Sequence, residues 1–151
     1  YCNIIWANNF PTRLSRIVTL QKRAVRTIAK IKYRDSTINA FKELKILKVR
    51  EITELEISLL MFKFYNNQLP KNMTYLFSTN SQIHSYDTRH ANDCHLPRKS
   101  SRLGQYSLAY QGPKIWNTID DKTRKIKALH LYKRKIKKKI LDKSAVANFS
   151  L

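Results

Sequence analysis

Glycine is almost absent from this chain, which has only two glycines, Gly104 and Gly112, in 151 residues. Tight β-hairpins depend on glycine because it adopts left-handed backbone conformations at little steric cost. A sheet built from many hairpins is therefore disfavoured, and helices are favoured. Cysteine is also scarce, since Cys2 and Cys94 form no disulfide framework, and this indicates a reducing, intracellular compartment.

Long hydrophobic runs and acidic residues are lacking as well. No stretch approaches the roughly 20 apolar residues of a membrane-spanning helix, so we expect no membrane partner. Only 10 Asp and Glu stand against 30 Lys and Arg, which gives a net charge of +20. Repulsion of that size destabilises a folded chain unless a polyanion neutralises it, and nucleic acid is the commonest such partner. A generally lysine-rich proteome is the alternative, and it predicts an even excess.

The positive charge is concentrated at the two ends of the chain. Residues 1–50 carry twelve Lys and Arg with two acids, residues 51–100 five with five, and residues 101–151 thirteen with three. This neutral middle argues against a uniform lysine bias. We therefore predict two basic regions around a packed middle, and RNA or DNA as the partner.

The spacing of apolar residues predicts a single, small, mainly α-helical domain over residues 1–143, followed by a frayed tail at 144–151. One helix should begin after Pro11, with Thr12 as its N-cap, and run to about Ile28. The residues expected on its buried face are Leu14, Ile17, Val18, Gln21, Ala24, Val25 and Ile28.

Two further helices are expected before residue 70. A short one should be capped within residues 35–37. Its expected buried residues are Ile38, Phe41, Leu44 and Leu47. A longer one, from about Arg50 to Asn66, should place residues 59–62 at the centre of the core, because they make it apolar nearly all round.

Residues 78–112 are expected to be irregular or extended, because Ser, Thr, Asn, Asp and His dominate residues 78–106. The expected anchors of this segment are Ile83, Tyr86 and Leu96. A short strand is predicted at 107–110 and a turn at 111–113, before a brief helix. A basic amphipathic helix should then run from about 128 to 143, with Leu129, Tyr132, Ile136 and Ile140 on its buried side.

Five short motif clusters occur in a recognisable order. They are residues 1–6 (Tyr-Cys-Asn-Ile-Ile-Trp) with 20–26 (Leu-Gln-Lys-Arg-Ala-Val-Arg), 44–47 (Leu-Lys-Ile-Leu), 69–70 (Leu-Pro), 83–89 (Ile-His-Ser-Tyr-Asp-Thr-Arg) and 110–117 (Tyr-Gln-Gly-Pro-Lys-Ile-Trp-Asn). In this order the chain, over residues 1–141, resembles the region after the polymerase domain of jockey-like non-LTR (LINE-class) retrotransposons. It departs at Ala7, where that family usually has Gly, and at 118–121, where the family tends to have Leu-Pro.

The resemblance implies a piece of a transposable element's reverse transcriptase, an RNA-directed DNA polymerase. In that family the endonuclease and the polymerase palm lie upstream. The resemblance implies that this chain, as the region after the thumb, helps to hold template RNA or target DNA during target-primed reverse transcription. The implied partners are RNA or DNA and the upstream polymerase domain of the same polyprotein, with a nuclear and cytoplasmic location. The first residue is Tyr rather than Met, which fits a fragment of a longer protein.

No catalytic site is expected in this chain alone. A reverse transcriptase palm needs paired carboxylates that hold two metal ions, and it carries them on apolar strands. The pair Asp120 and Asp121 instead precedes a basic stretch at a helix start, where Asp120 would act as an N-cap. We also expect no cofactor and no small-molecule substrate.

Three residues, His84, His90 and Cys94, are weak candidates for a metal site, with His95 beside them. Zinc is bound by Cys and His side chains in a tetrahedral arrangement. The adjacent Cys94 and His95 can hardly both reach one ion without strain. Ordinary polar loop residues are the alternative, and no metal is expected.

The predicted nucleic-acid-binding residues lie mainly on the first and last long helices. Arginines of the first helix, with Tyr33 and Arg34 just beyond it, could follow a phosphate backbone, and lysines of the last could act as point charges. Both basic faces lack the interspersed acids of a merely solvated face. The predicted residues are Arg13, Arg16, Lys22, Arg23, Arg26, Lys30, Arg34, Tyr86, Arg89, Lys133, Arg134, Lys135, Lys137, Lys138 and Lys139.

Among the aromatic residues, Trp6 and Trp116 are expected in the core, whereas Tyr86 and Tyr106 are the expected base-stacking residues. The lysine run is compatible with a nuclear localisation signal. Three alternatives stay open: a structural module that packs on the polymerase thumb without touching nucleic acid, a membrane-surface helix at 128–143, and a decayed retrotransposon copy.

Overall fold

The computed structural model of the chain describes residues 2–85 and 89–146. Within these residues it is helical, apart from loops and one isolated antiparallel bridge between Thr79 and Cys94, which confirms the mainly α fold. The helices are α1 (Asn3–Trp6), α2 (Pro11–Ala29), α3 (Ile38–Glu43), α4 (Val49–Tyr65), α5 (Lys71–Thr74), α6 (Asn80–Ile83), α7 (Arg102–Gln105), α8 (Leu108–Asn117), α9 (Asp121–Arg124) and α10 (Leu129–Val146).

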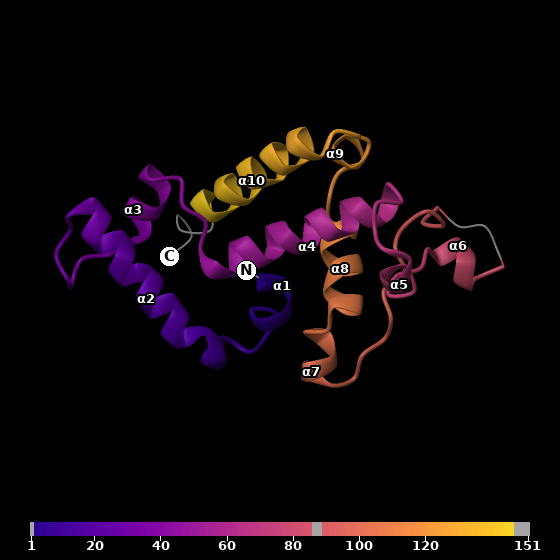
Figure 1. Ribbon diagram of the computed structural model, residues 1–151, viewed down its shortest axis with the longest axis horizontal. Helices are drawn as coiled ribbons and strands as arrows, with labels where there is room; N and C mark the ends of the chain where they lie inside the picture. Colours follow the sequence, from indigo (N-terminus) through magenta and orange to yellow (C-terminus); the bar gives the residue numbers. More distant parts are fainter. Residues whose placement is uncertain (1, 86–88, 147–151) are drawn as a thin grey trace.

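Helix α4 runs through the middle of the molecule and packs against α1, α8 and α10 (Figure 1). Its sequence explains this position, because residues 59–62 are all buried and a helix that is apolar on every side needs neighbours all round. The predicted third helix and its place at the centre of the core are therefore confirmed. The main core consists of Leu47, Leu55, Leu59, Leu60, Met61, Phe62, Phe77, Cys94, Trp116, Ile119, Tyr132, Ile136 and Ile140.

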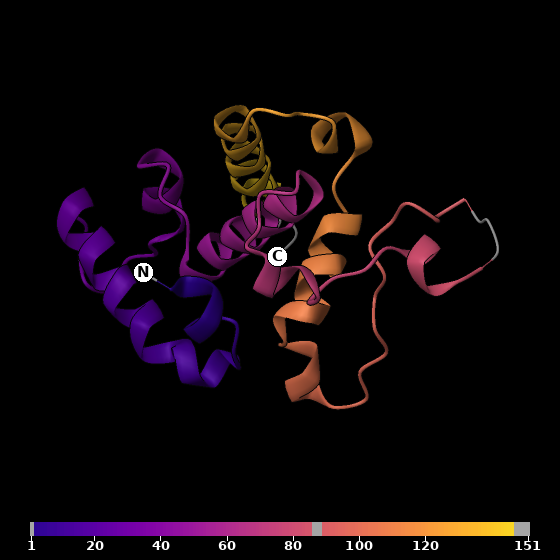
Figure 2. The same ribbon diagram turned by 45° about the vertical axis from the view of Figure 1, so that its right-hand side comes forward.

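Helices α2 and α3 lie on one side of α4, and α6 lies on the other (Figure 2). The Gln21 side chain ties α2 to the start of α4: its amide nitrogen donates to the Leu47 carbonyl (2.8 Å), and its amide oxygen accepts from the Val49 N–H (3.1 Å). The first N–H groups of a helix have no partner within the helix, so this contact satisfies one of them.

The predicted buried face of α2 is only partly correct. Leu14 and Val25 are buried, but Ile17, Ala24 and Ile28 are exposed. The reason is that α2 packs on α3 and the start of α4 along one side only. The N-cap is Phe10 instead of the predicted Thr12, so the helix begins two residues earlier, at Pro11. A proline loses no hydrogen bond at the first helical position, where the N–H has no partner within the helix.

Three helices end in the same left-handed turn without a glycine. Lys30 after α2, Lys45 after α3 and Asn67 after α4 have φ angles of 53°, 51° and 54°. In each turn the next residue's N–H donates to a carbonyl five residues back; the pairs are Ile31 with Arg26, Ile46 with Phe41 and Gln68 with Lys63. Glycine is the usual residue at this position because a Cβ is crowded there, so both lysines are strained.

The irregular segment is shorter than predicted. Helix α8 begins at Leu108, so the predicted strand at 107–110 and turn at 111–113 are wrong. Gly112 is buried inside α8, where a Cβ would lie 2.7 Å from both the Met61 sulfur and Phe77 Cε1. Because Gly112 has no side chain, α8 can approach α4 closely. Gly112 is therefore a packing residue instead of a turn residue.

The expected anchors of the irregular segment are also wrong where the structure describes them. Ile83 and Leu96 are exposed, and Tyr86 lies outside the described residues. Phe77 and Cys94 are buried in their place. The Asn117 side chain on α8 holds this segment, since it donates to the Cys94 carbonyl (2.8 Å) and accepts the Cys94 N–H (3.2 Å).

Helix α10 is the predicted basic amphipathic helix. Tyr132, Ile136 and Ile140 are buried against α4, whereas Leu129 remains exposed. The helix continues to Val146, beyond the predicted end at 143, and residues 147–151 lie outside the described residues. No helix in the described ranges combines the length and the apolar character that crossing a membrane requires.

Candidate nucleic-acid interface

A cleft of about 530 Å³ lies between the α3 region and residues 134–144 of α10, and we call it the basic cleft. Its apolar lining comes from Ile38, Phe41, Ile46 and Leu141. Its basic lining consists of Lys42, Lys45, Lys48, Arg134, Lys137 and Lys138, whereas Glu51 and Asp142 are its acidic residues. The cleft therefore combines residues that lie about ninety positions apart in the sequence.

Helical spacing explains the wall on α10. Arg134, Lys137, Lys138 and Leu141 recur three and four residues apart, so they share one side of the helix. That side lies beside the face that packs on α4. On the opposite wall, the left-handed turn at Lys45 reverses the chain between α3 and α4, which places the nearby lysines along the cleft.

The two acidic residues, Glu51 and Asp142, stand against six basic ones, so the lining keeps an excess of positive charge. The Glu51 carboxylate accepts the Lys48 N–H (2.8 Å) at the start of α4, and its other oxygen lies 3.9 Å from the Lys48 ammonium. The Glu51 charge therefore interacts with the N-terminus of α4 and with one lysine, Lys48. A cleft lined mainly by one sign of charge, with apolar walls, focuses its field and attracts ions of the opposite sign.

A second hollow, of about 510 Å³, lies between α2 and α3, and we call it the α2 hollow. It shares Ile38, Phe41 and Lys48 with the basic cleft, so the two adjoin. Its other charged residues are Lys22, Arg26, Arg34 and Asp35. Positive side chains therefore line a path from α2, past α3, to α10.

The structure brings together only some of the predicted nucleic-acid-binding residues. Arg134, Lys137 and Lys138 line the basic cleft, and Lys22, Arg26 and Arg34 line the α2 hollow. The predicted residues that are exposed outside both hollows are Arg13, Arg16, Arg23, Lys30, Arg89, Lys133 and Lys135. Tyr86 lies outside the described residues.

Lys139 and Asp120 have a structural role. The Lys139 ammonium forms an ion pair with the Asp120 carboxylate and donates to the Thr123 hydroxyl (3.0 Å). Asp120 also accepts the Thr123 N–H (3.1 Å) and caps α9, which confirms the predicted N-cap. Lys139 is therefore fixed on the α9 side of α10, away from the basic cleft.

Three lysines of the cleft, Lys42, Lys45 and Lys48, are not among the residues that the sequence predicts to bind. They lie on a six-residue helix and in the loop that follows it, where no helical period marks a shared face. The signal available was coarse, namely the excess of positive charge in residues 1–50.

The candidate metal ligands each have another partner. The Cys94 thiol donates to the Ser78 carbonyl (3.4 Å), and burial raises its pKa to about 11, so it stays protonated at neutral pH. His90 bonds to the Asp93 carboxylate (2.8 Å), and the His84 and His95 rings meet edge to face, 6.0 Å apart. Within 2–85 and 89–146, no group of three or more His, Cys, Asp or Glu could hold a metal ion.

The aromatic residues only partly follow prediction. Trp116 is buried and stacks on Tyr65, with the ring centroids 4.6 Å apart. Trp6, however, is 39% exposed, because α1 is a single turn on the surface of α4. Tyr106 is half-buried against Phe10 (4.9 Å), so its ring is not freely available to a base.

The fold and the cleft thus define a small helical domain with a basic, partly apolar groove. No protein-family model, no curated protein and no solved structure matches the chain.

Proposed function

We propose that this chain binds nucleic acid through the basic cleft. In this proposal it is an accessory region of a LINE-class RNA-directed DNA polymerase and holds template RNA or target DNA during target-primed reverse transcription. The observation that supports binding is that six Lys and Arg from two distant parts of the chain line one cleft. The polymerase part rests on the five motif clusters and their order.

The chemistry of the cleft suits phosphates better than base edges. Five of its six basic residues are lysines, whose ammonium groups act as point charges. Contacts of this kind release counterions and hold a nucleic acid without reading its sequence. Binding should therefore be largely independent of sequence and sensitive to salt.

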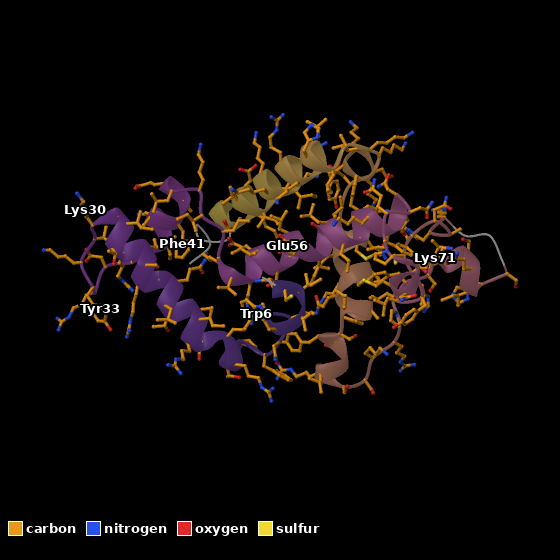
Figure 3. All side chains as sticks on the ribbon, in the orientation of Figure 1. Trp6, Lys30, Tyr33, Phe41, Glu56 and Lys71 are labelled. Carbon is orange, nitrogen blue, oxygen red and sulfur yellow. The ribbon has the colours of Figure 1, made fainter. Side chains whose placement is uncertain are left out.

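Two matched sets of substitutions test the cleft. The cleft variant carries Lys45→Gln, Arg134→Gln, Lys137→Gln and Lys138→Gln. The control variant carries Lys63→Gln, Lys71→Gln, Lys122→Gln and Lys127→Gln, all at exposed positions outside both hollows. Lys71 lies at the opposite end of the molecule from Lys30 and Tyr33 (Figure 3). Both variants lose the same charge, so only the place of the charge differs.

Affinity for labelled RNA and DNA should fall in the cleft variant and stay near wild type in the control. Exposed ion pairs contribute about 0.2–1 kcal/mol each, so four lost contacts should weaken binding about 4- to 800-fold. Equal losses in the two variants would mean that net charge alone drives binding. Unchanged affinity of the cleft variant would reject the cleft as the interface.

A second candidate function is a structural module that packs on the polymerase domain. The observation in its favour is an apolar stripe on α2 that the chain itself leaves exposed: Ile17, Leu20, Ala24 and Ile28 recur at helical spacing, with Leu20 54% and Ile28 60% exposed. Leu20→Asp combined with Ile28→Asp should abolish association with the polymerase domain of the parent protein, supplied as a separate chain. Intact association of that variant would reject the module.

A further inference from the structure

An exposed tyrosine stands in the basic loop between α2 and α3. Tyr33 is 74% exposed, so burial of its ring contributes little to folding. Lys30, Lys32 and Arg34 surround it in the sequence and are all exposed. Figure 3 shows Tyr33 and Lys30 at one end of the molecule.

The loop holds Tyr33 in a defined turn. The Asp35 N–H donates to the Lys32 carbonyl (3.1 Å), which closes a four-residue turn with Tyr33 at its second position. The Asp35 carboxylate accepts the Lys32 N–H (3.3 Å). The one acid of this loop is therefore used within the turn.

Arg26 on α2 links this turn to the α2 hollow. Its guanidinium donates to the Asp35 carbonyl (3.3 Å) and lies over the Tyr33 ring, 5.6 Å from the centroid. Arg26 and Arg34 also line the α2 hollow, which adjoins the basic cleft. The ring thus stands at the outer end of the path of positive charge.

An exposed aromatic ring beside a row of positive side chains is suited to bind an unpaired nucleobase and the phosphates next to it. Bases of a single strand stack on aromatic side chains while nearby cations hold the backbone. The bases of an intact duplex are already stacked on each other and paired, so they offer no free face except at the ends. Arginine on the ring adds a cation–π contact and helps to fix the ring's orientation.

We propose that Tyr33 stacks on an unpaired base of single-stranded RNA or DNA whose phosphates follow the α2 hollow into the basic cleft. This inference rests on the proposed nucleic-acid-binding function and adds its ligand class. The selected ligand is a single strand or an unpaired segment, and the intact duplex binds through charge alone.

Single substitutions at exposed tyrosines test the stacking contact. The variants are Tyr33→Ala, Tyr33→Leu and Tyr33→Phe, with Tyr75→Ala as the control, because Tyr75 is 80% exposed and follows α5 on another part of the surface. Fluorescence anisotropy would give the Kd of each for a labelled single-stranded DNA, an RNA of the same sequence and a blunt DNA duplex of equal length. Thermal unfolding would check each fold.

Tyr33→Ala and Tyr33→Leu should weaken single-strand binding by about 5- to 150-fold, the usual effect of removing one stacking ring. Tyr33→Phe and Tyr75→Ala should bind like wild type, and the duplex should lose less than about twofold, since no charge changes. The DNA and RNA arms show which single strand is preferred.

The outcomes separate this inference from the cleft proposal. If Tyr33→Ala binds both single strands with wild-type affinity, stacking is overturned. An equal loss of affinity for single strand and duplex also overturns it. Neither result bears on the cleft proposal. A loss in Tyr33→Ala with no loss in the cleft variant supports stacking and rejects the cleft. Absence of any wild-type binding at low salt overturns both.

Discussion

Lys45 is a residue at which folding stability and ligand binding should change in opposite directions. It adopts a left-handed conformation with φ of 51° after α3, and it lines the basic cleft. That conformation costs an ordinary residue about 1–2 kcal/mol, because its Cβ crowds the backbone, although glycine loses more entropy on folding. We expect Lys45→Gly to stabilise the fold by about 0.5–1 kcal/mol, which raises the Tm of a domain of this size by about 1–4 °C.

The same substitution removes one of the six basic residues of the cleft. Affinity for nucleic acid should fall, and the slope of log K against log salt should become about one unit shallower. Asn67→Gly is the matched control, because Asn67 has φ of 54° at the end of α4 and carries no charge. It should stabilise the fold slightly and leave binding unchanged.

Thermal unfolding followed by circular dichroism and fluorescence anisotropy on the same preparations measure the two effects. A lower Tm for Lys45→Gly would refute the left-handed turn at this position. A higher Tm with unchanged affinity and slope would remove Lys45 from the interface.

Three further predictions concern core packing, the dependence of stability on pH, and the reactivity of the two thiols. Gly112→Ala should destabilise the fold by about 1–3 kcal/mol in urea titrations, because the added Cβ overpacks against Met61 and Phe77; a near-neutral effect would contradict the close approach of α8 to α4. Burial alone would raise the pKa of Asp93, but hydrogen bonds from Arg124 and His90 outweigh it and lower that pKa below its ordinary 3.8. The stability it adds is present above pH 3.8 and lost as the pH falls below that value, so Asp93→Asn should flatten the acid limb of stability against pH. Finally, Ellman's reagent should react quickly with the exposed Cys2 and only after unfolding with the buried Cys94; fast reaction of Cys94 would contradict its burial.

The two long helices of the core were predictable because local pattern and tertiary packing agree in them. The apolar run at 59–62 and the spacing of Tyr132, Ile136 and Ile140 each specify a buried surface, and all of these residues are buried. The outer helix α2 was predicted as a helix from the spacing of its apolar residues alone. Its burial was overestimated, because apolar spacing does not reveal how many neighbours a helix has.

Only the second half of helix α8 was predicted, as a brief helix after residue 113, because the local signals of its first half indicate a strand and a turn. Glycine followed by proline usually breaks a helix. In this chain Gly112 is needed for contact with Met61 and Phe77, which lie far away in the sequence. Contacts between distant segments decide that element, and no short window of sequence contains them.

The same limit applies to the candidate site. Charge counts identified both basic ends, and helical spacing identified the buried side of α10. The whole run from Lys133 to Lys139 was predicted to bind, whereas only Arg134, Lys137 and Lys138 of it line the basic cleft. The opposing wall from Lys42 to Lys48 depends on how α10 packs on α4 and on the Gln21 contact that fixes α2 at the start of α4. These are tertiary contacts, so the sequence predicted the charge and did not predict the cleft.

The central claim is that the basic cleft holds the phosphate backbone, and the salt dependence of single-strand binding tests it most directly. If the six basic residues of the cleft each neutralise one phosphate, they should contribute about −4 to the slope of log K against log salt, in addition to any contacts in the α2 hollow. The cleft variant, which loses four of them, should have a slope about 3 units shallower than wild type, and the control variant should match wild type. Equal slopes for wild type and the cleft variant, or no binding by wild type at low salt, would contradict the claim.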